Sequence, residues 1–304
     1  MQEIIAEIQS AIEEMEKDAS LYEEKNFDSR IEALDFIDFR IIDPLENLPQ
    51  KTGHADKLIL LKHRAEKIKT GLEGVDTALF QKLREKIRVA DYRGNAFKDL
   101  VNEYVDFDVN HNQHHEEAGY DNLDIFINEL FPPLPMPEPT KDLEPEMVFY
   151  QKTPARIVFE LVEKAHFATN DVFFDLGSGL GQVAILVNLL AGVIVKGIEF
   201  EPVFCDYARD CAAILNLSNV SFINIDARLA DYSHGTIFFM FTPFRGEILQ
   251  EVLAVLRKES LRRKIKIITY GPCTALVAQQ SWLNCAVPAE NHLYKLCVFI
   301  SFKD

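Results

Sequence analysis

A glycine-rich segment in the second half of the chain is the first candidate for chemistry: it runs Asp171-Val-Phe-Phe-Asp-Leu-Gly-Ser-Gly-Leu-Gly-Gln-Val183. Gly177, Gly179 and Gly181 follow a short apolar strand and would let the backbone approach a ligand closely. Their GxGxG spacing differs from the GxGxxG of dinucleotide sites, and Asp175 at the strand end opposes a pyrophosphate. A carboxylate at this position can accept hydrogen bonds from a cationic amine, directly or through water.

Two more acidic residues stand at the ends of predicted strands. Glu199 closes the second strand, about 20 positions after the glycine loop, where an acidic residue accepts two ribose hydroxyls. Asp226 closes the third strand and could accept a hydrogen bond from an adenine amino group. The three carboxylates together predict a site for a nucleoside that also carries an amine.

The elements that must position these side chains alternate between strand and helix. Strands are predicted at residues 171–176, 193–198, 220–225, 237–241 and 265–269, and helices at about 154–167, 183–190, 203–215 and 248–257. This alternation predicts an α/β fold, a doubly wound, mostly parallel, Rossmann-like sheet with helices on both faces. The segment Tyr294 to Phe302 has no strong helix before it and is expected to add an antiparallel edge strand.

The first half of the chain has the apolar spacing of helices. Three stripes repeat at intervals of three and four residues: Ile4, Ile5, Ile8, Ile12 and Met15; Leu79, Phe80, Leu83 and Ile87; Phe97, Leu100, Val101 and Tyr104. Gly94 is expected to end the helix that precedes it. No alternating strand pattern of useful length stands before Pro132, so an all-α N-terminal domain is predicted.

A proline-rich segment separates the two halves. Five prolines fall within nine residues between Phe131 and Pro139, which excludes helix and favours an extended spacer over a ligand for a partner. We therefore predict an acidic helical domain at 1–130, a linker at 131–146 and a second domain at 147–304.

The charge of the 304-residue chain is distributed unevenly. The formal net charge is −16, and residues 1–150 carry all of it, with 33 acidic and 17 basic side chains against 15 of each in residues 151–304. A field of this sign repels phosphate, so the N-terminal half is not expected to bind nucleic acid. Two explanations stay open, namely solubility and the steering of a basic partner.

The remaining composition indicates a cytoplasmic protein. The N-terminus lacks the pattern of a secretory signal, and no apolar stretch reaches the roughly 20 residues of a membrane span. The five cysteines are odd in number and lack CxxC spacing, which favours reduced thiols over disulfides or a zinc site. No membrane partner is expected, and the sequence does not indicate an oligomeric state.

A possible metal site in the first half is disfavoured. Residues at the spacing of a calcium loop are Asp106, Asp108, Asn110, Asn112 and Glu117, but His111 stands where such a loop needs glycine. Neighbouring His114, His115 and Glu116 lack a second cluster to complete a transition-metal site. We predict a solvated acidic loop and no bound metal.

The glycine loop with Asp175, Glu199 and Asp226 resembles that of class I S-adenosylmethionine-dependent methyltransferases, over about residues 147–304. The segment Tyr150-Gln-Lys-Thr153 before the same loop is similar to non-SET protein-lysine methyltransferases of the disruptor-of-telomeric-silencing type. This resemblance implies S-adenosylmethionine as cofactor and cofactor contacts for Tyr150, Thr153 and Gln182. Taken alone, Thr153-Pro154 is equally explained as a helix N-cap with proline at the first helical position.

The acceptor site is expected after the fourth strand, in Phe241-Thr242-Pro243-Phe244. Amino-group methyltransferases often have Asn-Pro-Pro-aromatic here, and this sequence has Phe241 in place of the asparagine. Thr242, Pro243 and Phe244 are the predicted catalytic residues, with Thr242 or a backbone carbonyl orienting an amine. Phe244 is expected to form an aromatic wall, whereas the pattern favours a core position for Phe241.

The function predicted from these residues is methylation of a protein amine such as lysine, on a protein substrate that could be basic. Methylation of RNA or a small molecule on the same fold is an alternative. A non-catalytic binding protein that keeps the cofactor pocket is another, because Phe241 departs from the usual acceptor segment.

Overall fold

The computed structural model describes residues 2–47, 55–89, 92–105, 120–287 and 294–302. The chain forms two compact units, Met1–Leu83 with Leu100–Phe107, and Arg84–Asp99 with Asp108–Asp304. The division therefore falls within the long helix α4 (Ala55–Val89) and within α5 (Asn95–Asn102) rather than at the predicted boundary near residue 130. Over the described ranges, no helix has both the length and the apolar character needed to cross a membrane.

The first unit is helical, as predicted. It contains α1 (Gln2–Lys17), the 3-10 turn η1 (Ala19–Tyr22), α2 (Phe27–Phe36), the π-helical turn η2 (Ile37–Ile42), α3 (Asp43–Asn47) and most of α4. The predicted stripe of α1 faces inward, with Ile5, Ile8 and Ile12 buried. Arg30 is also fully buried, and its Nε donates to the Asp76 carboxylate at 2.7 Å.

The second unit is built on one seven-stranded sheet in the order β3-β2-β1-β4-β5-β7-β6. Its strands are β1 (Val172–Leu176), β2 (Ile194–Glu199), β3 (Val220–Asn224), β4 (Ile237–Met240), β5 (Lys266–Thr269), β6 (Leu283–Val287) and β7 (Cys297–Ser301). The first five are parallel, and β7 is antiparallel to both neighbours. The prediction for the last segment is thus half right: β7 is antiparallel, but β6, which was not predicted, takes the edge.

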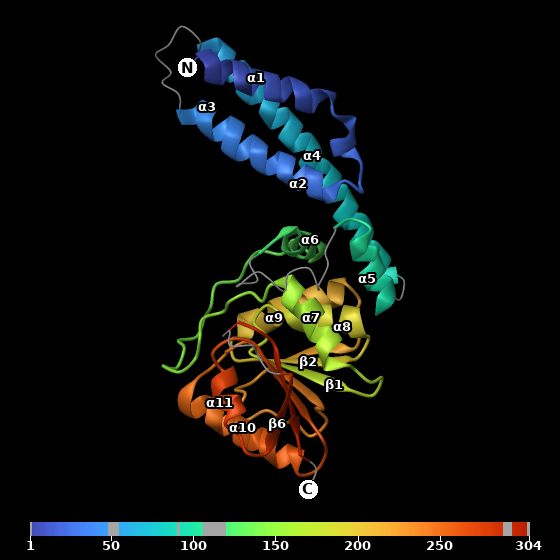
Figure 1. The fold of residues 1–304 in the computed structure, drawn as a ribbon, viewed down its shortest axis with the longest axis vertical. Helices are drawn as coiled ribbons and strands as arrows, with labels where there is room; N and C mark the ends of the chain where they lie inside the picture. The colour runs from blue at the N-terminus through green and yellow to red at the C-terminus, as the bar shows by residue number, and fades with distance from the viewer. Residues whose placement is uncertain (1, 48–54, 90–91, 106–119, 288–293, 303–304) are drawn as a thin grey trace. The chain divides into compact units, whose positions relative to one another are not determined.

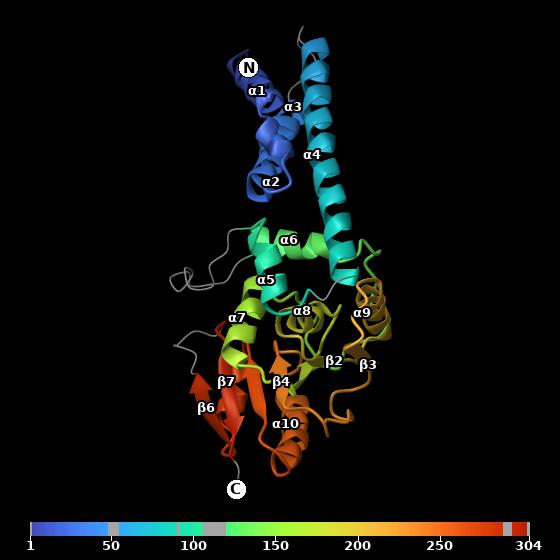
Figure 2. The same ribbon diagram turned by 90° about the vertical axis from the view of Figure 1, so that its right-hand side faces the viewer.

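Helices cover both faces of the sheet, which confirms the predicted fold class (Figures 1 and 2). One face carries α7 (Ala155–Ala165), α8 (Gln182–Ala191) and α9 (Pro202–Ile214), and the other carries α10 (Gly246–Ser260) and α11 (Thr274–Ala278). Successive strand residues point to opposite faces, so Phe174 stacks on Phe238 in the core beneath α10, while Phe173 stacks on Phe239 on the other side.

Gly94 does not end the preceding helix. It has a left-handed backbone (φ +61°), as expected of a terminating glycine, but it stands at the start of α5, where its carbonyl accepts from the N–H groups of Phe97 and Lys98. Its own N–H donates to the carbonyl of Leu189 at the end of α8 at 2.8 Å. The glycine therefore ties the start of α5 to the end of α8 within the second unit.

The segment 131–146 has no regular helix or strand, as its prolines predict, but it is not a free linker. Glu201 at the start of α9 is buried and accepts from the Thr140 N–H (2.9 Å), the Thr140 hydroxyl (2.6 Å) and the Lys141 N–H (2.8 Å). Further along, Glu146 accepts from the N–H of Ile248 in the first turn of α10 at 2.9 Å. These contacts hold the segment on the second unit.

Candidate functional site

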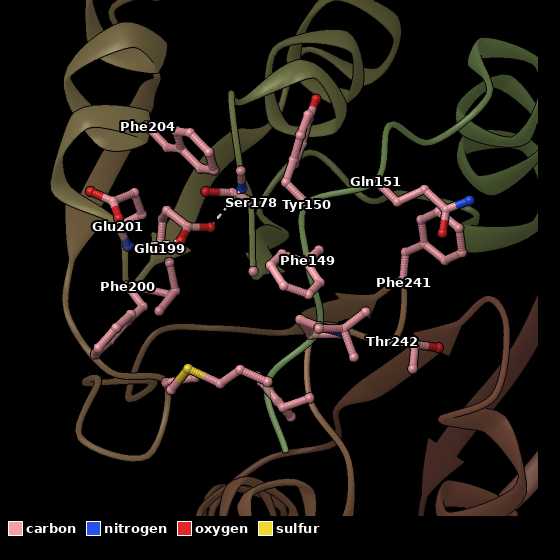
Figure 3. A pocket seen from close by; sticks show the side chains of 18 of the residues that line it. Phe149, Tyr150, Gln151, Ser178, Glu199, Phe200, Glu201, Phe204, Phe241 and Thr242 are labelled. Atoms are coloured by element: carbon pink, nitrogen blue, oxygen red, sulfur yellow. Dashed lines mark hydrogen bonds between the residues drawn. The ribbon is translucent and has the colours of Figure 1, made fainter. Parts of the chain in front are cut away.

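A pocket of about 640 Å³ opens at the carboxyl ends of β1, β2, β3 and β4 (Figure 3). Every predicted site residue except Gly181 lines it: Tyr150, Thr153, Asp175, Gly177, Gly179, Gln182, Glu199, Asp226, Thr242, Pro243 and Phe244. Parallel strands end at one edge of the sheet, so residues far apart in the chain meet there. In Figure 3, Tyr150 and Phe149 stand between Glu199 on one side and Phe241 and Thr242 on the other.

The glycines of the loop are required by close packing. A Cβ at Gly177 would lie 2.3 Å from the Pro243 side chain, and a Cβ at Gly179 would lie 2.3 Å from the Tyr150 ring. Gly181 is the N-cap of α8 with φ +83°, and it lies behind the pocket against Phe222. The loop thus brings the Tyr150 segment and the segment after β4 into contact around the end of β1.

Asp175 and Glu199 form an acidic pair at the ends of β1 and β2. Burial, together with the nearby Glu199 carboxylate, raises the pKa of Asp175 to about 8. Burial also raises the pKa of Glu199, although this carboxylate accepts from the N–H of Gly179 at 2.7 Å and from the N–H of Glu201 at 2.9 Å. The backbone bonds orient Glu199 and leave lone pairs that can accept two ribose hydroxyls.

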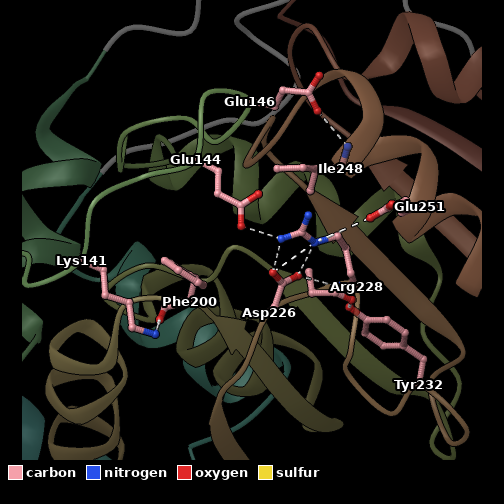
Figure 4. A network of polar contacts seen from close by, with 10 residues as sticks. Lys141, Glu144, Glu146, Phe200, Asp226, Arg228, Tyr232, Ile248 and Glu251 are labelled. Atoms are coloured by element: carbon pink, nitrogen blue, oxygen red, sulfur yellow. Dashed lines mark hydrogen bonds and ion pairs between the residues drawn. The ribbon is translucent and has the colours of Figure 1, made fainter.

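Asp226 already forms an ion pair, which was not predicted (Figure 4). Arg228 donates to both of its carboxylate oxygens at 2.6–3.1 Å, which lowers the pKa of Asp226. The same guanidinium donates to Glu144 at 2.7 Å. Asp226 lines the pocket, but Arg228 already donates to both of its carboxylate oxygens. An adenine amine that bonds to Asp226 would therefore have to share this carboxylate with Arg228.

The pocket contains polar atoms that the protein leaves without partners. Within the described residues, the Ser178 hydroxyl and both amide atoms of Gln182 are buried and make no hydrogen bond. Buried polar groups normally have partners, so these atoms indicate a polar ligand. Their place at the glycine loop, beside Asp175 and Glu199, fits an amine-bearing nucleoside such as S-adenosylmethionine.

Thr153 is buried on the pocket wall and does not cap α7. Pro154 is the N-cap residue, and the helix begins at Ala155. The Ala155 N–H is satisfied by the carboxylate of Asp124, on helix α6 (Asn122–Leu130), at 2.8 Å. The capping explanation of Thr153-Pro154 is therefore wrong, and the placement of Thr153 fits the implied cofactor contact.

The predicted acceptor residues are in the pocket wall, but two of them differ from expectation. Thr242 has φ +41°, and its buried hydroxyl bonds to the Tyr270 carbonyl (3.3 Å) and the Cys273 N–H (3.2 Å), so it is not free to orient an amine. Phe244 is buried at 5% exposure in the core cluster beneath α10, where Met147 and Phe244 form a β-bridge. Phe244 also lines the pocket, so its place in an aromatic wall stays a prediction, although most of its ring belongs to the core.

Phe241, assigned to the core from its pattern, is instead the half-buried aromatic ring of this wall. Its ring lies 5.0 Å from that of Tyr270, which contacts Tyr294 at 5.8 Å. Phe149, 84% exposed, and Gln151 also line the pocket and were missed. Their positions next to Tyr150 were the only sequence signal that could have identified them.

Metal binding finds no support in the described residues, which contain no group of three or more histidine, cysteine or acidic side chains that could hold an ion. The calcium-like residues from Asp106 to Glu117 and their histidines lie outside the described ranges. All five cysteines are free thiols.

Comparison with known proteins gives one family and a set of structures. Residues 146–256, a little over a third of the chain, match the family described as "Histone methylation protein DOT1". No curated protein matches the chain.

Three solved structures illustrate the structural similarity. An RNA methyltransferase from Salinibacter ruber with S-adenosyl-L-homocysteine shows 23% identity over 50% of this chain and 92% of that one, with a TM-score of 0.41. Precorrin-6y C5,15-methyltransferase from Geobacter metallireducens shows 16% identity over 52% and 93% (TM-score 0.39). The ribosomal protein L11 methylase of Lactobacillus delbrueckii shows 15% identity over 49% and 78% (TM-score 0.38).

Proposed function

We propose that the chain is a class I S-adenosylmethionine-dependent methyltransferase resembling the DOT1 type, and that it methylates lysine side chains of a protein. The observation that carries the proposal is the family match, which spans the glycine loop, the three strand-end acids and the segment after β4. S-adenosylmethionine supplies an electrophilic methyl group on a sulfonium, and its transfer forms an N–C bond, breaks an S–C bond and releases a proton.

The residues of the chain hold and shield the reactants. Glu199 is oriented by two backbone N–H groups to accept ribose hydroxyls, and Asp175, once ionised, can accept from an amine. Ser178 and Gln182 offer the hydrogen-bonding atoms that are otherwise unsatisfied. Alignment of the reactants and exclusion of water are the main contributions that such a site makes to rate.

The acceptor side of the pocket suits a long aliphatic amine. Phe241, which packs on the buried ring of Tyr270, presents aromatic surface to a lysine stem and would stabilise a methylated cation through its ring face. Excess acidic charge in residues 1–150 would attract a basic protein, and we propose a basic protein partner on this ground. We propose a cytoplasmic location, in keeping with the free thiols.

Labelling of a cell extract tests the substrate class. Protein carrying Glu199→Ala serves as the control that lacks the ribose contact. We expect methyl label from S-adenosylmethionine to enter the protease-sensitive fraction, to appear as methyl-lysine after acid hydrolysis, and to vanish when amines are acetylated beforehand.

The other outcomes identify the alternatives. Label that is removed by nuclease and survives protease would replace the lysine proposal with RNA methylation, and label in small molecules would indicate a metabolite acceptor. Cofactor binding without labelled product in any fraction would indicate a non-catalytic binding protein.

A further inference from the structure

We propose that the side-chain amide of Gln151 binds the acceptor amine and orients it, while Phe241, backed by Tyr270, forms the wall along its carbon chain. This inference rests on the proposed methyltransferase function and names the residue that performs the step expected of Thr242. Its basis is the division of the pocket into two chemically different halves and the position of the Gln151 amide in the half that lacks acidic side chains.

The half at the ends of β1, β2 and β3 contains the acidic side chains of the pocket. Among its lining residues the acids are Asp142, Asp175, Glu199, Glu201 and Asp226. A nucleoside held by Glu199 at the end of β2 therefore leaves the ends of β4 and β5 for the acceptor, on the other side of the glycine loop. Figure 3 places Gln151, Phe241 and Thr242 together on that side of Tyr150.

The acceptor half has few polar side chains, and two of them, Thr242 and Arg245, are poorly suited to bind an amine. The Thr242 hydroxyl is occupied by Tyr270 and Cys273, and its backbone is held at φ +41°. Arg245 lines the pocket, but a guanidinium only donates hydrogen bonds.

Gln151 differs from these residues. It is exposed, it lines the pocket, and its side-chain amide has no hydrogen-bonding partner within the described residues. Its neighbours Tyr150 and Thr153 line the same pocket, which fixes the backbone of Gln151 at the wall. The amide oxygen can accept an N–H of the amine without adding charge, so the nitrogen lone pair stays available as the nucleophile.

Binding of two cofactor analogues tests this assignment without knowledge of the natural substrate. In both, a nitrogen atom replaces the sulfur of S-adenosylhomocysteine; one carries an aminoethyl arm in the direction of the acceptor and the other carries a propyl arm of similar length. Calorimetry compares full-length wild type with Gln151→Leu, and with Gln250→Leu on the exposed face of α10 as the matched control. S-adenosylhomocysteine itself reports whether each variant is folded.

We expect wild type and Gln250→Leu to prefer the aminoethyl arm by about tenfold, which corresponds to one hydrogen bond to a polar amine. Gln151→Leu should lose this preference and keep the wild-type affinity for S-adenosylhomocysteine. A preference that survives in Gln151→Leu, or equal binding of both arms by wild type, would overturn the role of Gln151. Failure of wild type to bind S-adenosylhomocysteine would instead refute the methyltransferase function itself, and labelled RNA in the extract experiment would refute only the lysine substrate.

Discussion

The buried carboxyl of Asp175 should make cofactor binding depend on pH. Asp175 is 3% exposed, and its pKa is raised to about 8 from 3.8, because burial and then Glu199 disfavour the charged form. An ionised carboxylate is needed to hold the amine of the cofactor. Below pH 8 the carboxyl must first lose a proton, so the affinity should fall about tenfold for each pH unit, or about 1.4 kcal/mol.

The same shift has a consequence for stability. Between pH 3.8 and about 8 the folded protein binds a proton at Asp175 that the unfolded chain has lost. Stability therefore falls as the pH rises through this window, by about 1.4 kcal/mol per unit and about 4 kcal/mol by pH 7. Asp175→Asn removes the ionisable group, so this variant should be more stable than wild type at pH 7 to 8 without cofactor, and should bind the cofactor weakly at every pH.

Calorimetric titration with S-adenosylmethionine between pH 6 and 8, with urea unfolding at the same pH values, checks both consequences. Asp206→Asn removes a carboxylate that is exposed, paired with Arg209 and outside the pocket, and should behave as wild type. The α-amino group of the cofactor loses its own proton near pH 8. The fall in cofactor affinity from pH 8 down to pH 6 is therefore the part of the profile that reports on Asp175. An affinity that stays constant from pH 6 to 8 in wild type would refute the assignment of Asp175.

Three further substitutions test the packing around the site and in the first unit. Gly179→Ala would place a methyl group 2.3 Å from the Tyr150 ring at φ +51°, so cofactor affinity should fall at least tenfold, measured by calorimetry, with far-UV circular dichroism unchanged. Glu201→Ala leaves two backbone N–H groups and a hydroxyl of the 140–141 segment unpaired, and should lower the free energy of unfolding by about 1–3 kcal/mol in urea. Arg30→Ala leaves Asp76 buried without its cation and should cost about 3–5 kcal/mol, a loss that Asp76→Ala in the same protein should partly restore.

Residues whose roles follow from local sequence were predicted well. The positions of Asp175 and Glu199 at the ends of strands follow from apolar runs and glycine turns, which act over a few residues. The first five strands and their helices were predicted for the same reason. The edge strand β6, which follows the short helix α11 and has exposed residues at Asn284, Cys285 and Ala286, lacks such a pattern and was missed.

Residues whose roles depend on distant segments could not be assigned from the sequence. Thr242 was predicted to face the acceptor, but the turn after β4 gives it a left-handed backbone and directs its hydroxyl to the 270–273 turn after β5. Phe241 continues the apolar pattern of β4, so periodicity favoured a buried position; β4 ends at Met240, and the ring instead packs on Tyr270 at the pocket. Both outcomes are set by where β4 ends relative to β5.

The ion pair of Asp226 and Arg228 is a second case in which distant residues decide a role that the local sequence does not reveal. The sequence places a carboxylate at the end of β3, but its charge is balanced by an arginine two residues later, which also reaches Glu144 of the 131–146 segment. Because Glu144 takes up part of the donor capacity of Arg228, Asp226 keeps lone pairs that could accept from an adenine amine. The segment predicted as a linker therefore stabilises the nucleoside end of the pocket, and removing Glu144 should weaken cofactor binding through Arg228 although Glu144 itself does not line the site.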